Sequence, residues 1–155
     1  MERFNVGQLT KEMVVARLSE LQDPCDAAAE VARKTIMIAL QNAQTFEPEH
    51  KHSIIEICAG AMTGLVLREQ NLPRGACCVL KKAYESAVLL NLDPTEVMEL
   101  AIRGIVYVRK FTNSAQFREI ENAVAAEFMG INEVFRKICE ESEGRPSDHS
   151  ALPES

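Results

Sequence analysis

The chain has 155 residues, which suits one domain with one hydrophobic core. Its formal net charge of -6 argues against a general nucleic-acid binder, because such proteins neutralise phosphates with a surplus of Lys and Arg. Aromatic residues make up 5% and tryptophan is absent, so the core must be aliphatic. Because Ala and Glu are abundant, this composition favours helices over sheet and predicts an all-α fold.

The first helix is predicted from about Thr10 to Leu21. Val14, Leu18 and Leu21 recur there at helical spacing, while charged residues occupy the opposite side. The helix is short and one side of it is polar. We therefore expect it to pack as an arm on the other helices of this chain or on a second subunit.

Prolines mark the starts of the next helices, because a helix loses no hydrogen bond when proline takes its first position. Pro24, Pro48, Pro73 and Pro94 predict helices over about 24–44, 48–70, 73–90 and 94–111. The short connections between them predict antiparallel neighbours. In the third of these helices, the spacing predicts that Tyr84 and Val88 face the core.

A last helical run begins near Asn113, whose spacing from Gln116 fits a capping box. Apolar residues recur at steps of three and four as far as Ile138, which is long for one helix, so Gly130 would bend or divide it. Residues 144–155 are polar and are predicted to be a mobile tail. The sequence thus predicts one domain over 1–143, a compact antiparallel bundle of about five to six helices around a central helix near 48–70.

The central helix carries the most apolar stretch of the chain, from Ile54 to Leu67. Its apolar arc is too broad for a helix that rests on a single neighbour. Ser53, Gly60 and Gly64 form a strip of small residues, which indicates that something backbone-like approaches closely there. The candidates are another helix of the chain, the same helix of a second subunit, or a ligand.

Glu56, beside this strip, is a candidate ligand-binding or acid–base residue together with His52. A covered strip would partly desolvate the carboxylate, as enzymes do with general acids and bases. The alternative is a structural contact with His52 one helical turn earlier, or an ion pair with a cation of another helix.

The start of the same helix suggests a metal site. Glu49 and His52 have the Glu-x-x-His spacing of di-metal bundles, but such sites need more histidines than this chain provides inside one bundle. A surface site for a divalent metal could form from His50, His52 and Glu49. The alternative is a solvated acidic first turn that favours the helix dipole. No other cofactor is predicted.

The predicted location is the cytoplasm. The uncharged part of the central helix, 57–67, is shorter than the roughly 20 residues of a membrane span. The N-terminus lacks the apolar segment of a signal peptide, and the five cysteines are odd in number, as expected of free thiols in a reducing compartment.

Cys77, near a helix start and Arg74, is either a reactive thiol or a small buried apolar residue.

Two functions compete. The leading hypothesis is a non-enzymatic helical interaction or regulatory module that self-associates as a homodimer or another homo-oligomer, with a protein partner as a further option. The alternative is a helical protein that binds a small molecule or metal, with or without catalysis, at a site beside His52 and Glu56. Nucleic-acid and membrane binding are not expected.

Overall fold

The computed structural model describes residues 5–18, 23–43 and 45–143. The described residues form helices and no strand, which confirms the predicted all-α bundle. In chain order the helices are α1 (Val6–Leu18), α2 (Pro24–Leu40), α3 (Pro48–Leu67), α4 (Leu72–Leu90), α5 (Pro94–Val106), the 3-10 helix η1 (Tyr107–Phe111), α6 (Ser114–Glu127) and α7 (Ile131–Glu143). The predicted tail lies outside the described residues, as does the end of the predicted first helix.

Local capping explains the helix starts. The side chains of Asp23, Asn71 and Asp93 accept backbone N–H groups at the starts of α2, α4 and α5, where proline takes the first or second helical position. Asn113 and Gln116 exchange the two hydrogen bonds of a capping box, at 2.8 and 3.0 Å. The predicted proline starts and the predicted capping box are thus confirmed, and the cap at Asn71 is an addition to them.

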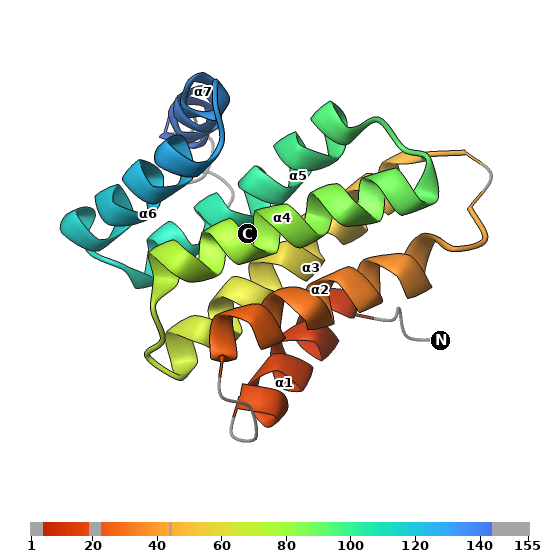
Figure 1. Ribbon diagram of the computed structural model, residues 1–155, viewed down its shortest axis with the longest axis horizontal. Coiled ribbons are helices and arrows are strands. Elements are labelled where there is room, and N and C mark those ends of the chain that lie inside the picture. Colours follow the sequence, from red (N-terminus) through yellow and green to blue (C-terminus); the bar gives the residue numbers. More distant parts are fainter. Residues whose placement is uncertain (1–4, 19–22, 44, 144–155) are drawn as a thin grey trace, which may run out of the picture.

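Helix α3 is the centre of the bundle. It contacts α1, α2, α4, α5 and η1, and Figure 1 shows it behind α2 and α4. Ile54, Ile57, Met62 and Leu65 are fully buried, as the broad apolar arc predicts. Because neighbours surround α3 on several sides, it fixes the relative positions of the other helices.

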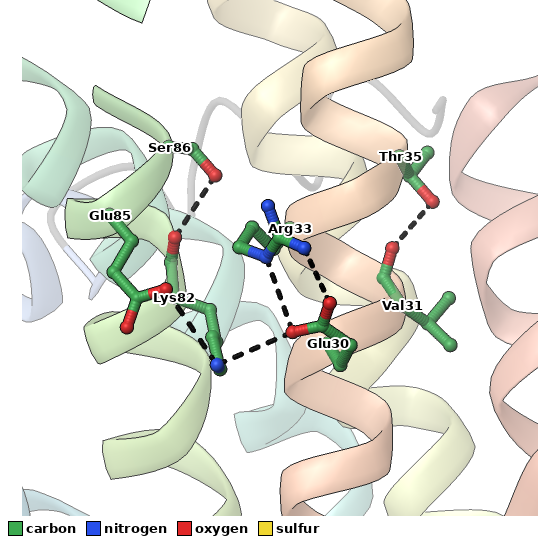
Figure 2. A network of polar contacts seen from close by, with 7 residues as sticks. All are labelled: Glu30, Val31, Arg33, Thr35, Lys82, Glu85 and Ser86. Carbon is green, nitrogen blue, oxygen red and sulfur yellow. Dashed lines mark hydrogen bonds and ion pairs between the residues drawn. The ribbon is translucent and has the colours of Figure 1, made fainter. Parts of the chain in front are cut away.

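Helices α2 and α4 run side by side in the same direction (Figure 1). Their facing residues include many alanines, which permit close approach, and a side chain at Gly75 of α4 would require Leu65 of α3 to move. A polar network bridges the two helices at their surface (Figure 2). In it, Glu30 accepts hydrogen bonds from Arg33, and Lys82 lies 3.3 Å from Glu30.

The predicted final helix is divided in two. Helix α6 ends at Glu127, Phe128 is its C-cap, and Gly130 takes a left-handed conformation with φ +78° before α7 begins. The rings of Phe117 and Phe135 meet with centroids 5.7 Å apart, so α7 folds back on α6. Together α6 and α7 pack against α4 and α5 at one side of the molecule (Figure 1).

Candidate functional site

The small-residue strip of α3 is covered by α1 of the same chain. A Cβ atom at Gly60 would overlap the carbonyl oxygen of Gly7 and lie 3.2 Å from the backbone nitrogen of Lys11. A Cβ atom at Gly64 would lie 2.7 Å from Cγ1 of Val14. The two glycines therefore serve an intrachain helix crossing, which was one of the three candidates. Ser53 is half-buried two turns earlier on α3, so the tight part of the crossing is at Gly60 and Gly64.

A groove lies beside this crossing, with a volume of about 430 Å³; we call it the Glu56 groove. Its lining comes from the start of α1, one face of α3, and η1: Asn5, Gly7, Gln8, Lys11, His52, Ile55, Glu56, Ala59, Gly60, Thr63, Tyr107 and Phe111. Gly7 and Gly60 line the groove where the backbones of α1 and α3 meet, and neither contributes a side chain to it. The predicted pair His52 and Glu56 therefore lines a real hollow.

Within the groove, His52 and Glu56 contact each other. Nε2 of His52 lies 3.1 Å from a carboxylate oxygen of Glu56, one helical turn away. The side chains are 62% and 37% exposed, so water reaches both. The structure thus shows the i, i+4 contact between His52 and Glu56, which is the structural alternative to an acid–base role for Glu56. Both residues of this contact line the groove.

The three proposed metal ligands are not brought together. Nδ1 of His50 accepts the backbone N–H of Glu47 at 3.0 Å and so belongs to the cap of α3, whereas His52 pairs with Glu56. Among the residues that the structure describes, no three His, Cys, Asp or Glu side chains converge as a metal site would require. The arrangement of His50, His52 and Glu49 fits the capped, solvated first turn.

The cysteines are free thiols, and Cys25, Cys58 and Cys77 are buried. Burial raises the pKa of the Cys77 thiol above its usual value, and it raises the pKa of Cys58 to about 12. The Cys77 sulfur lies 3.5 Å from the carbonyl oxygen of Ala123 on α6. Because a reactive thiol needs a lowered pKa, Cys77 acts as a small packing residue between α4 and α6.

A second hollow was not predicted. It has a volume of about 500 Å³ and lies between α4, α5 and the turn from α6 to α7; we call it the Met129 groove. Its lining is mostly apolar: Tyr84, Pro94, Thr95, Met98, Glu99, Ile102, Glu127, Phe128, Met129, Gly130, Ile131 and Val134. The prediction that Tyr84 and Val88 face the core is wrong, since they are 49% and 52% exposed. The packing of α6 and α7 leaves this face of α4 uncovered.

Ion pairs hold the walls of the Met129 groove. Lys81 of α4 lies 3.0 Å from Glu127 of α6. Arg103 of α5 pairs with Glu99 at 3.4 Å and with Glu141 of α7 at 3.1 Å. The two acidic residues that line the groove, Glu99 and Glu127, therefore each have a neighbouring cation, although Glu99 shares Arg103 with Glu141.

Comparison with known proteins yields no matching family model, no matching curated protein and no matching solved structure. Among the described helices, none is both long and apolar enough to cross a membrane. The two grooves and the residues that line them are therefore the features that indicate a function.

Proposed function

We propose that this chain is a non-enzymatic helical interaction or regulatory module that self-associates through the Met129 groove. The observation that supports this proposal is the position of Met129 itself. Its side chain is 102% exposed at the turn between α6 and α7, yet it borders a mostly apolar hollow. A flexible thioether side chain of this kind is suited to filling an irregular apolar cavity.

A projecting side chain and a hollow on the same surface patch suit a two-fold homodimer. In such a dimer each copy uses the same patch, so Met129 of each copy can enter the groove of the other. The exposed ring of Tyr84, which also lines the groove, enlarges the apolar area that this pairing would remove from water. Because the groove acids are paired within the chain, the two copies would meet there without strong charge repulsion despite the net charge of -6.

Sedimentation velocity over about 1–200 µM tests this proposal, a range that covers typical moderate affinities. The unmodified chain should shift toward the dimer mass as its concentration rises. Met129→Lys should remain monomeric, because a charged side chain would have to be buried in the groove. Ile38→Lys is the matched control, since Ile38 is 68% exposed on α2 and does not line the groove. Monomers at every concentration, or equal effects of the two substitutions, would refute the proposal.

A second candidate function, binding of a small molecule beside His52 and Glu56, is supported by the Glu56 groove. Its volume of about 430 Å³ falls within the range of small-molecule sites, roughly 300–1,000 Å³. It combines apolar side chains with a few polar groups, as such sites do. A metal is not part of this candidate, because the structure does not bring His50, His52 and Glu49 together.

A further inference from the structure

We infer that the Glu56 groove binds a small organic anion that carries an aromatic ring, such as an aryl carboxylate. This inference depends on the second candidate function and is independent of self-association. It follows from three features of the groove: which of its charges are already paired, which of its donors are unused, and how its apolar side chains are arranged.

At the groove, two lysines stand against one carboxylate. Glu56 is the one carboxylate in the lining and contacts His52 at 3.1 Å, whereas Lys11 of α1 has no ion-pair partner among the described residues. A second ammonium group, that of Lys110, lies 4.3 Å from the ring centroid of Tyr107, which lines the groove. Lys110 likewise has no described carboxylate partner. In a chain with a net charge of -6, a hollow that is lined by Lys11 and has Lys110 next to its Tyr107 ring is a local exception, and it favours an anion.

The polar groups of the groove point to the same ligand class. Asn5 accepts the N–H of Gln8, Gln8 donates to Glu12, and Thr63 donates to the carbonyl of Ala59, so these three side chains already have partners. The hydroxyl of Tyr107 has no hydrogen-bond partner within the described part of the chain. The Tyr107 hydroxyl and the Lys11 ammonium are thus donors without a partner among the described residues, and a carboxylate supplies acceptors for both.

The apolar surface of the groove suits a flat ring. Ile55 and Ala59 of α3 line the groove together with the edge-to-face pair of Tyr107 and Phe111, whose centroids are 6.1 Å apart at an angle of 64°. Both rings are partly exposed, at 44% and 50%, so a ligand can contact them without displacing the core. Aromatic side chains favour edge-to-face and offset contacts with another ring.

The test is an NMR titration of the full chain with three probes that share one ring system: naphthalene-2-carboxylate, the neutral naphthalene-2-carboxamide, and the cationic 2-(aminomethyl)naphthalene. The carboxylate should give saturable shifts at the Ile55 methyl and Ala59 amide resonances and should bind most tightly. Lys11→Gln should weaken carboxylate binding about tenfold, the loss expected of a charged hydrogen bond, and leave carboxamide binding unchanged. Lys34→Gln, at an exposed position of α2, is the matched control.

Each alternative outcome overturns the inference in a distinguishable way. If all three probes shift Ile55 with equal affinity, the groove binds small molecules but does not select anions. If no probe shifts Ile55, or if the shifts fall on Met98 and Ile131 of the Met129 groove, the Glu56 groove is not a ligand site and the second candidate function fails with it. The probe comparison on the unmodified chain gives this result even if Lys11→Gln does not fold.

Discussion

Gly60 is the residue on which the packing of α1 depends most directly. In an unobstructed helix, Gly→Ala stabilises by about 1 kcal/mol. Here the added methyl group would overlap the Gly7 carbonyl, so we expect Gly60→Ala to destabilise the fold by about 1–3 kcal/mol, and Gly60→Leu by more. Chemical denaturation measures the change. Ala126→Leu, at an exposed position of α6, should change stability by less than about 0.5 kcal/mol, and a stabilised Gly60→Ala variant would contradict the crossing.

Glu30 gives the surface network between α2 and α4 a defined pH dependence. The hydrogen bond from Arg33, supported by Lys82, lowers the pKa of Glu30 from 4.5 to about 2 (Figure 2). A carboxyl group with a lowered pKa stabilises the folded state above its unfolded pKa and loses that contribution as it becomes protonated. The contribution of Glu30 should therefore be complete above about pH 4.5 and disappear as the pH falls toward 2.

Glu30→Gln tests this dependence. Because the side chain is 31% exposed, solvent screens the pair, and we expect a loss of about 1 kcal/mol or less at pH 7. The difference from the unmodified chain should shrink toward zero in urea denaturation near pH 2. Glu119→Gln, at an exposed position of α6, serves as the control. A loss that stays the same at pH 7 and pH 2 would show that Glu30 acts by packing rather than by charge.

At the scale of elements, the turn between α6 and α7 shapes the Met129 groove. Gly130 has φ +78° and no atom within 4 Å of a Cβ at that position, so Gly130→Ala would introduce backbone strain but no clash. We expect a cost of about 1–2 kcal/mol. Gly130→Asn should recover part of it, because Asn tolerates the left-handed region. Thermal unfolding of both variants measures this, and equal effects would argue that the turn is not left-handed.

The sequence predicts most elements because their ends depend on local contacts. Proline and the caps at Asp23, Asn113 and Asp93 involve residues only a few positions apart, so their pattern is visible in the chain. The apolar spacing predicts the first helix too late, from Thr10, because it does not show that Asn5 accepts the N–H of Gln8 at the start of α1. That error concealed Gly7, which lies inside α1 and contacts α3.

Properties that depend on distant residues were harder to predict. The small strip at Gly60 and Gly64 indicated a close neighbour, but the strip has no feature that identifies α1 as that neighbour. Tyr84 and Val88 continue the apolar spacing of α4, yet they are exposed because α6 and α7 cover only part of that helix. The Met129 groove therefore depends on tertiary packing. By contrast, His52 and Glu56 were predicted as a pair because they lie one turn apart on the same helix.

At the scale of the whole molecule, α3 connects the fold to both proposed functions. Its glycine face holds α1 and forms the floor of the Glu56 groove. On another face, Gly104 of α5 fits against the carbonyl oxygen of Ile55 and the backbone nitrogen of Ala59, and α5 in turn forms a wall of the Met129 groove. The two grooves use different helices, so we expect ligand binding and self-association to be separable by substitution.

Native-state hydrogen exchange measured by NMR tests the central position of α3 most directly. A helix surrounded by neighbours opens only when the whole domain unfolds, whereas peripheral helices open locally at lower free energy. We predict that amides 57–65 of α3 exchange most slowly, at the rate set by global unfolding, and that those of α7 exchange faster. Exchange in α3 that is as fast as in α7 would contradict the arrangement in which the other helices pack around it.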